Sequence, residues 1–430
     1  MKKLILSLIL ALALLLSILC GCGAVSGVDG RDGQDLSIYE IYEAANAARV
    51  EEGLEELSFL EFLTEYLQYD FTYSEQDSVQ AIMNRSLMSS VAIVTGFKYN
   101  TGGWSSRTQT DYYVGSGVIV DIDKSAGSAY ILTNCHVVYD DSSVNTYASE
   151  VYVFLYGADD LTVADKEDYI PAEIAGATVT YDLALLKVEN SEILKNSEAV
   201  AATFAEEEEV YAGANVYAVG NPEGCGIAVT RGIISRESES IAINLSSLHE
   251  NNDDYSITYR VIRTDAAVNG GNSGGGLYDY NGKLVGIINS KLISEEVDNM
   301  GYALAGSYVK RIWPLLRDGS GYGLQRAVFP ASYTYTSSAY FDNEKNLAVI
   351  TDKVIVTGSS FSGLMRGDVI KRIKVVSDSG EVVEDMRITR HFNVDDVILS
   401  ARKNYKVIYT ILRGDSEREV TSIADFEYCK

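Results

Sequence analysis

Apolar residues between about positions 89 and 316 occur in short runs rich in Val, Ile, Leu and Tyr, and turns rich in Gly, Asn and Asp separate these runs. Helix patterns do not alternate with the runs, so a parallel sheet built from β–α–β units is not expected. The pattern predicts an all-β barrel or sandwich. The clearest predicted strands are Val91–Thr95, Gly117–Asp121, Tyr130–Thr133, Glu150–Tyr156, Leu183–Val188, Asn215–Val219, Ile257–Thr264 and Leu284–Asn289.

The first 78 residues follow different patterns. Two lysines precede the apolar run Leu4–Leu19, which is shorter than the ~20 residues that a membrane-spanning helix needs. We expect a signal peptide over 1–21 and a linker over 22–36. From 37 to 78, two S-x-x-E capping boxes precede apolar residues at helical spacing, which predicts a short helical segment. This segment is either a docking or oligomerisation hairpin or a spacer that packs on the main body.

The end of the apolar run resembles the lipobox of bacterial lipoproteins. Leu19–Cys22 reads L-C-G-C, and the fourth residue of a lipobox is an acylated cysteine that becomes the mature N-terminus. The resemblance implies lipidation of Cys22, which would tether an exported protein to the outer face of a bacterial cytoplasmic membrane. The alternative is a plain cleaved signal with two incidental cysteines.

The amino-acid composition disfavours several classes of function. Asp and Glu number 61 against 35 Lys and Arg, and the net charge of −26 disfavours nucleic acid as a partner. Five cysteines do not make a disulfide framework in a chain of 430 residues. Only His136, His249 and His391 can supply imidazole chemistry. The acidic run Glu206–Glu209 lacks a neighbouring His or Cys, so we expect a solvated turn there and neither a metal site nor a cofactor.

Three stretches carry the residue types of nucleophilic catalysis. His136 ends a strand, Asp182 opens an apolar strand, and Ser273 lies in a glycine-dense turn. A serine hydroxyl needs a base, an imidazole can take its proton near neutral pH, and a carboxylate on the other ring nitrogen fixes the tautomer. Glycines let backbone N–H groups converge on a substrate oxyanion. Each stretch is a weak signal alone, but the three together, in this order, are specific.

The same stretches resemble the motifs of the HtrA/Deg group of trypsin-like serine proteases. Thr133–Val138 matches T-N-x-H-V-V, Asp182–Lys187 matches D-L-A-x-L-K, and Thr264–Gly275 matches T-D-A-A-x-N-x-G-N-S-G-G. The similarity covers roughly residues 89–316. It implies a trypsin-like double six-stranded β-barrel protease domain, over 79–317, with the active site between the barrels.

The resemblance assigns a role to each matching residue. It implies that His136 is the general base, Asp182 the acid that orients it, and Ser273 the nucleophile. The oxyanion hole would consist of the backbone N–H groups of Gly271, Asn272 and Ser273.

The substrate pocket is expected to be small and apolar. We predict that Val268, Ile288 and Asn289 line it, and none of these can bind a Lys or Arg side chain as an acid would. Such a pocket favours a Val-, Ala- or Leu-like residue before the scissile bond.

A cysteine stands directly beside the predicted base. Cys135 is either a thiol switch or a small buried apolar filler. Whether it pairs with Cys225 is open at this point.

A second unit follows the predicted protease domain. Gly358–Ile370 resembles the G-S-P-A-x-x-A-G-L-x-x-G-D-V-I signature of PDZ domains, and Tyr405–Thr421 resembles their closing hairpin. The resemblance implies a PDZ-like α+β domain over 325–430, with a helix near Val394–Lys403. PDZ domains bind a peptide C-terminus as an added strand. Because no clear carboxylate-binding loop stands around Ala327–Tyr335, both a peptide-binding domain and a degenerate appendage are open.

Three hypotheses about function follow. The first is a lipid-anchored, exported serine endopeptidase, by analogy a homotrimer, that cleaves unfolded or misfolded proteins without ATP or metal. The second is a catalytically silent scaffold that binds peptides, and the third is a substrate-specific processing protease. A complete set of His136, Asp182 and Ser273 argues against the scaffold.

Overall fold

The computed structural model describes residues 79–101, 107–158, 169–244, 256–290, 300–319, 321–343 and 346–429, together with five helical residues nearer the N-terminus, Tyr42, Asn46, Ala47, Arg49 and Val50. The predictions for the signal peptide, the linker, Cys22, most of 37–78 and His249 lie outside the described residues. Within the described part, no helix is long and apolar enough to cross a membrane. The chain divides into two compact units, Met1–Ser78 and Val79–Lys430, and the second is described below.

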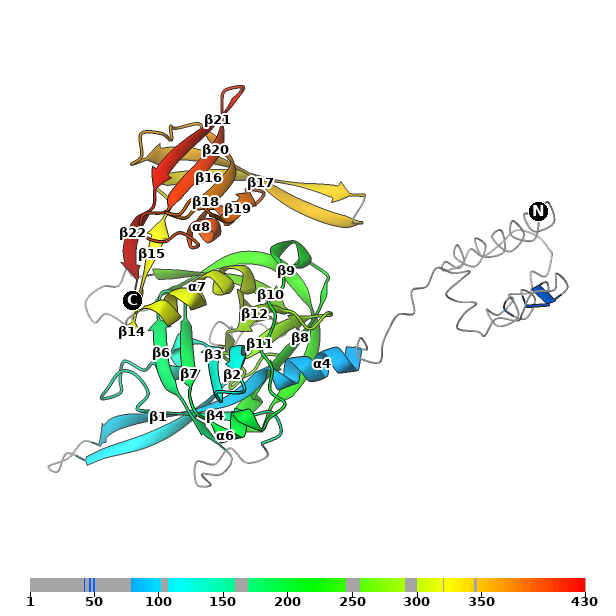
Figure 1. Ribbon diagram of the computed structural model, residues 1–430, viewed down its shortest axis with the longest axis vertical. Coiled ribbons are helices and arrows are strands. Elements are labelled where there is room, and N and C mark those ends of the chain that lie inside the picture. Colours follow the sequence, from blue (N-terminus) through cyan, green and yellow to red (C-terminus); the bar gives the residue numbers. More distant parts are fainter. Residues whose placement is uncertain are drawn as a thin grey trace. The chain divides into compact units, whose positions relative to one another are not determined.

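An eight-stranded sheet follows helix α4 (Val79–Met88), which Figure 1 labels. Its strand order is β14-β6-β7-β3-β2-β1-β4-β5. All neighbours pair antiparallel except β14 and β6. Its register brings Gly117 over the core, where a Cβ would lie 2.8 Å from both Ile131 and Ile93, so only glycine lets the strands approach this closely. The strands are β1 (Ser90–Thr101), β2 (Arg107–Asp123), β3 (Ser128–Thr133), β4 (Glu150–Leu155), β5 (Ile170–Pro171), β6 (Glu173–Thr178), β7 (Leu183–Val188) and β14 (Gly321–Tyr322).

A closed six-stranded barrel follows, with the order β10-β13-β12-β11-β8-β9. Closure leaves no strand edge unpaired, which removes a route to aggregation. The all-β trypsin-like fold is confirmed, but the first sheet has eight strands where six were expected, because the two-residue strands β5 and β14 extend its ends. The barrel strands are β8 (Asn215–Gly220), β9 (Ala228–Asn244), β10 (Ser256–Thr264), β11 (Gly276–Asp279), β12 (Leu284–Ile288) and β13 (Gly301–Ala305).

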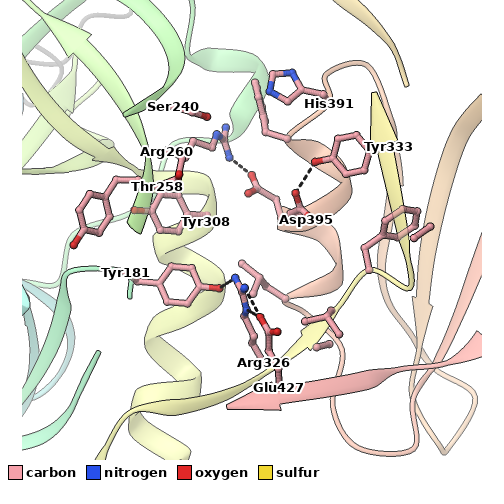
Figure 2. A pocket seen from close by; sticks show the side chains of 18 residues that line it. Tyr181, Ser240, Thr258, Arg260, Tyr308, Arg326, Tyr333, His391, Asp395 and Glu427 are labelled. Carbon is pink, nitrogen blue, oxygen red and sulfur yellow. Dashed lines mark hydrogen bonds and ion pairs between the residues drawn. The ribbon is translucent and has the colours of Figure 1, made fainter. Parts of the chain in front are cut away.

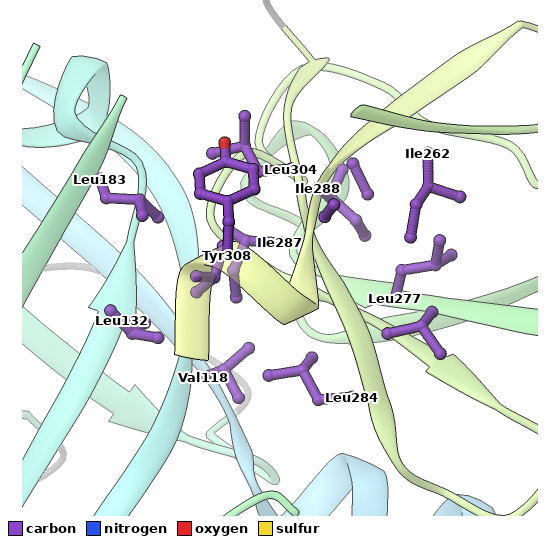
Figure 3. Packing of buried hydrophobic residues seen from close by; sticks show 14 of the residues in the cluster. Val118, Leu132, Leu183, Ile262, Leu277, Leu284, Ile287, Ile288, Leu304 and Tyr308 are labelled. Carbon is purple, nitrogen blue, oxygen red and sulfur yellow. The ribbon is translucent and has the colours of Figure 1, made fainter. Parts of the chain in front are cut away.

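One hydrophobic core joins the sheet to the barrel (Figure 3). Leu132 and Leu183 project from β3 and β7, and Leu277 and Leu304 meet them from the barrel, all fully buried. Each such side chain contributes about 1.5–3 kcal/mol through burial. Helix α7 (Gly306–Asp318) seals this core with Tyr308, which is 3% exposed. The core therefore fixes the ends of β3 and β7 against the loop that precedes β11.

The C-terminal part is an α+β unit with its own core. Its main sheet has the order β16-β17-β18-β20-β21, β19 pairs with β18, and β15 pairs with β22. The predicted closing hairpin is present as β20 and β21, whereas the helix predicted near Val394–Lys403 spans only Asn393–Ile398, and the chain turns at Asn404 (φ +71°) before β20 begins. The elements are β15 (Leu324–Val328), β16 (Ala331–Asp342), β17 (Leu347–Ser359), β18 (Val369–Val376), β19 (Val382–Arg387), α8 (Asn393–Ile398), β20 (Lys406–Arg413), β21 (Ser416–Ile423) and β22 (Asp425–Cys429).

A buried ion pair fastens the loop before β18 to β20. The Asp368 side chain is 1% exposed and accepts hydrogen bonds of 2.8 and 2.7 Å from Arg413. Asp368 also accepts a hydrogen bond from the backbone N–H of Met365. The hydrogen bonds from Arg413 are the main cause that lowers the pKa of the Asp368 carboxyl.

Replacing Arg413 by methionine is expected to lower the free energy of unfolding at pH 7, because a buried carboxylate loses its partner. Since the pKa of Asp368 is lower in the folded state, this contribution is present above the ordinary carboxyl pKa of about 4 and is lost as the pH falls through the folded value. Calorimetric unfolding between pH 7 and pH 3 checks it. Lys371→Met removes an exposed cation from β18 as the control, and a difference independent of pH would contradict the ion-pair explanation.

Candidate active site

The three predicted catalytic residues come from three separate loops. Strand β3 ends at Thr133, and the short helix α5 (Cys135–Val138) that follows carries His136. Asp182 directly precedes β7, and Ser273 lies three residues before β11. The fully buried Asn134 ties two of these loops together, since its Nδ2 donates to the backbone oxygen of Asp182 over 3.1 Å.

The structure brings the three side chains into one hydrogen-bonded chain. Nε2 of His136 lies 2.9 Å from Oγ of Ser273, and Nδ1 of His136 lies 2.8 Å from Oδ2 of Asp182. The backbone N–H of His136 donates to Oδ1 of Asp182 over 2.9 Å. Asp182 and Ser273 are each 5% exposed, and the His136 side chain is 20% exposed. The imidazole therefore lies between a buried carboxylate and a hydroxyl that it can deprotonate.

Asp182 has an unusual backbone conformation. Its φ is +49°, in the left-handed region that residues with a Cβ rarely adopt. Such conformations cost about 1–3 kcal/mol and are held by the surrounding structure. Here both carboxylate oxygens are fixed by hydrogen bonds, so the strained backbone serves to aim the side chain at His136.

A further donor to Asp182 was not expected from the sequence. Nδ2 of Asn289 donates to Oδ2 of Asp182 over 2.7 Å, and Asn289 is 0% exposed. The Asn289 side chain therefore contacts Asp182, and Ile288 is 0% exposed in the hydrophobic core, so the pocket role of both stays a prediction. Val268 is half-buried beside Gly301, where it can face a substrate.

The glycine-dense turn is shaped by close backbone contacts. Gly271 has a φ of +89°, and a Cβ there would lie 2.2 Å from the backbone oxygen of Asn221. The N–H of Asn272 donates to the backbone oxygen of Asn269 over 3.1 Å. Among the described residues, no acceptor takes the N–H of Gly271 or of Ser273. The predicted oxyanion hole therefore keeps two unengaged N–H groups, whereas the N–H of Asn272, also predicted for it, is already engaged.

A second serine contacts the predicted nucleophile. Oγ of Ser290 lies 2.5 Å from Oγ of Ser273, and the backbone N–H of Ser290 lies 3.3 Å from the same oxygen. In the sequence, Ser290 is marked only by its position directly after Asn289. Ser290 is therefore a polar group at the reacting oxygen that motif comparison does not reveal.

The surroundings of Cys135 and of the acidic run Glu206–Glu209 indicate roles in packing and ion pairing. Cys135 is 1% exposed in the hydrophobic core, as expected of a buried filler, and it forms no disulfide with the exposed Cys225. The acidic run forms a short 3-10 turn in which Glu209 pairs with Lys283 at 2.5 Å. In the part of the chain that the structure describes, no cluster of His, Cys, Asp and Glu could hold a metal ion.

Asn289→Ala is expected to lower kcat roughly 100-fold with little change in KM, because a misplaced Asp182 no longer orients His136. Asn289→Ser retains a donor and should recover part of kcat. Initial rates on a peptide substrate give both constants, and Asn281→Ala, in an exposed turn, is the control. A variant whose KM rises while kcat is unchanged would contradict the positioning role.

Comparison with known proteins gives consistent matches. A family model described as a trypsin-like peptidase domain matches residues 115–287. The serine protease Do-like HtrA of Bacillus subtilis is 29% identical over 334 residues, which cover 75% of this chain and 68% of that protein. The periplasmic serine endoprotease DegP of Escherichia coli is 31% identical over 213 residues, which cover 49% of this chain but only 37% of that protein. A solved structure of the HtrA-type protease AlgW with a decapeptide aligns with 81% of this chain and 99% of that one, at 21% identity and a TM-score of 0.48.

Proposed function

Since this chain belongs to the HtrA group of trypsin-like serine proteases, we propose that it is an ATP-independent endopeptidase that cleaves unfolded or misfolded exported proteins. The observation that carries the proposal is the hydrogen-bonded chain in which His136 Nδ1 lies 2.8 Å from Asp182 Oδ2 and His136 Nε2 lies 2.9 Å from Ser273 Oγ. A buried carboxylate, an imidazole and a hydroxyl in this sequence form the arrangement that acyl transfer requires.

The proposed reaction has two halves. Ser273 Oγ attacks the scissile carbonyl carbon while His136 Nε2 takes the hydroxyl proton, and Asp182 stabilises the resulting imidazolium. The carbonyl oxygen becomes an oxyanion that the N–H groups of Gly271 and Ser273 stabilise. His136 then gives its proton to the leaving amine, and an acyl-enzyme remains. In the second half a water molecule attacks the acyl group by the same proton transfers, which releases the acid and restores Ser273.

We propose an unfolded chain as substrate, cleaved after a small apolar residue. The half-buried Val268 supplies an apolar wall near Ser273 in the sequence, and a charged side chain would lose hydration there without gaining a partner. A folded protein presents extended segments only at exposed loops and termini, whereas an unfolded one presents them along its whole length.

Degradation of β-casein, an unfolded protein, tests the proposal against degradation of a folded protein of similar size. The expected result is cleavage of β-casein, without ATP and in the presence of EDTA, mainly after Val, Ala and Leu. Mass spectrometry of the new termini identifies the cleavage positions. Cleavage at a single site in one protein, with β-casein left intact, would favour the substrate-specific processing protease instead.

We also propose that the protein is exported, lipid-anchored at Cys22 and trimeric. The name of the Escherichia coli relative places that protein in the periplasm, and the L-C-G-C stretch at 19–22 supports a lipid anchor on this chain. For the C-terminal part we propose a PDZ-like role in holding peptides, which rests on its α+β architecture and on the Gly358–Ile370 signature.

Cys22→Ala is expected to move the protein from the membrane fraction to the soluble fraction, because the acylated thiol is lost. Fractionation of bacterial cells followed by immunoblotting measures the distribution. Cys20→Ala is the matched control and should stay with the membrane. Membrane retention of Cys22→Ala would show another means of attachment.

A further inference from the structure

A cavity of about 510 Å³ lies between the barrel and the C-terminal part, away from Ser273. Its walls come from β10 and α7 on the barrel side and from β15, β16 and α8 on the other side (Figure 2). Figure 2 shows Tyr181 and Tyr308 on one wall and Tyr333 and Asp395 on the other. Both parts of Val79–Lys430 therefore contribute to one site that the proposed proteolysis does not use.

The two arginines of the cavity are already neutralised. Arg260 forms ion pairs with Asp396 and, at 3.3 Å, with Glu207, and its guanidinium lies 3.8 Å from the centre of the Phe392 ring. Arg326 forms an ion pair with Glu427. Neither cation is left to attract an anionic ligand, such as the carboxylate of a peptide C-terminus.

The carboxylate of Asp395, by contrast, has no ion-pair partner within the described part of the chain. It accepts a 2.6 Å hydrogen bond from the hydroxyl of Tyr333, and it lines the cavity. The nearby His391 is held at Nδ1 by Asp352, 2.7 Å away, and stacked on Tyr335. Burial raises the pKa of Asp395, and the Tyr333 hydrogen bond and the charge of Arg326 offset this only in part, so a bound cation would further stabilise the ionised form.

Aromatic rings make up much of the cavity wall. Ring faces attract cations through their quadrupole, and an aromatic cage with a carboxylate is the arrangement that binds organic cations. The lining charges favour a cation too, because three carboxylates face two guanidinium groups. The lining aromatic residues are Tyr181, Tyr259, Tyr308, Phe329, Tyr333 and Phe392.

We propose that this cavity binds an organic ammonium or guanidinium group, with Asp395 as its counter-ion and the surrounding rings as its cage. The group comes either from a free amine or from a basic side chain of a peptide. The volume of the cavity falls in the range of small-ligand sites, about 300–1,000 Å³, so the cation and several attached carbons fit. A cation bound there contacts both the barrel and the C-terminal part.

Isothermal titration of the full chain carrying Ser273→Ala tests this, because the variant keeps the cavity but cannot digest itself or the probe. The probes are Nα-acetyl-lysine methylamide, its neutral isostere Nα-acetyl-norleucine methylamide, and 1,5-diaminopentane. We expect saturable binding of the lysine probe, the diamine or both, and at least tenfold weaker binding of the norleucine probe. Preference for the lysine probe assigns the site to a peptide side chain, and preference for the diamine assigns it to a free amine.

Asp395→Asn removes the charge and should weaken binding of the cationic probe at least tenfold. Asp415→Asn, in the exposed turn after β20, is the matched control and should bind like the parent. Comparing their melting temperatures reports whether Asp395→Asn folds. The comparison of the better-binding cation with the norleucine probe decides the question without any cavity variant. Norleucine-probe binding as tight as that of the better-binding cation, or no saturable binding of either cation, would overturn the proposal, even if β-casein is cleaved as proposed above.

Discussion

Replacing Ser273 by alanine is expected to lower kcat roughly 10⁶-fold. The hydroxyl that accepts the acyl group is lost, and water in its place would have to react without covalent catalysis. The fold should survive, because alanine removes one oxygen from a position that is 5% exposed and creates no clash. The melting temperature should therefore stay close to that of the parent protein.

Two measurements check this result. Labelling with a fluorophosphonate probe reports the activated serine, and hydrolysis of β-casein reports turnover. Ser290→Ala is the matched control, because it removes the hydroxyl 2.5 Å from Ser273 Oγ yet keeps the nucleophile, so this variant should still be labelled. Labelling of Ser273→Ala would place the nucleophile elsewhere, and an unlabelled parent protein would favour the silent scaffold.

The barrel fold and the residues of the triad could be predicted from the sequence, because each is marked by a pattern of a few consecutive residues. A strand of β-branched and aromatic residues is recognisable from a few consecutive positions, and each predicted strand between Val91 and Asn289 is present. His136, Asp182 and Ser273 each stand in a motif of six to twelve residues. Motifs of that length are specific even though the residues are far apart in the chain.

The partners of the triad could not be read in the same way, because they depend on packing between distant segments. Asn289 reaches Asp182 only because the end of β12 and the start of β7 lie at the same place across the shared core. Nothing in the sequence around Asn289 separates a pocket wall from a buried donor. The same holds for the extra edge strand β14, which pairs with β6 from more than 140 positions away.

The cavity beside α8 was likewise invisible to sequence reasoning. Asp395 follows Val394 in a short helix, and taken alone it is an ordinary polar residue on a helix surface. Its significance comes from the barrel residues that cover it, among them Tyr308 and Arg260. A carboxylate that lacks an ion-pair partner in the folded protein cannot be recognised from a sequence in which acidic residues are abundant.

Asp182→Asn is expected to lower kcat about 10⁴-fold at neutral pH while KM changes little. The carboxylate accepts three hydrogen bonds, two on Oδ2 from His136 Nδ1 and Asn289 Nδ2, and one on Oδ1 from the His136 backbone. An asparagine offers one oxygen and one NH₂ group, so in either orientation the NH₂ faces a donor. If it takes the Oδ2 position, His136 must carry its proton on Nε2, and the ring can no longer accept the proton of Ser273.

Asp141→Asn is the matched control for this substitution, because it makes the same change of charge at an exposed position. Its kcat should equal that of the parent protein. Steady-state kinetics on a peptide substrate measure both variants, and the fluorophosphonate labelling rate should fall in parallel with kcat for Asp182→Asn. A loss of less than tenfold in kcat would mean that His136 is held in its working tautomer by something other than this carboxylate, and the proposed role of Asp182 would then be wrong.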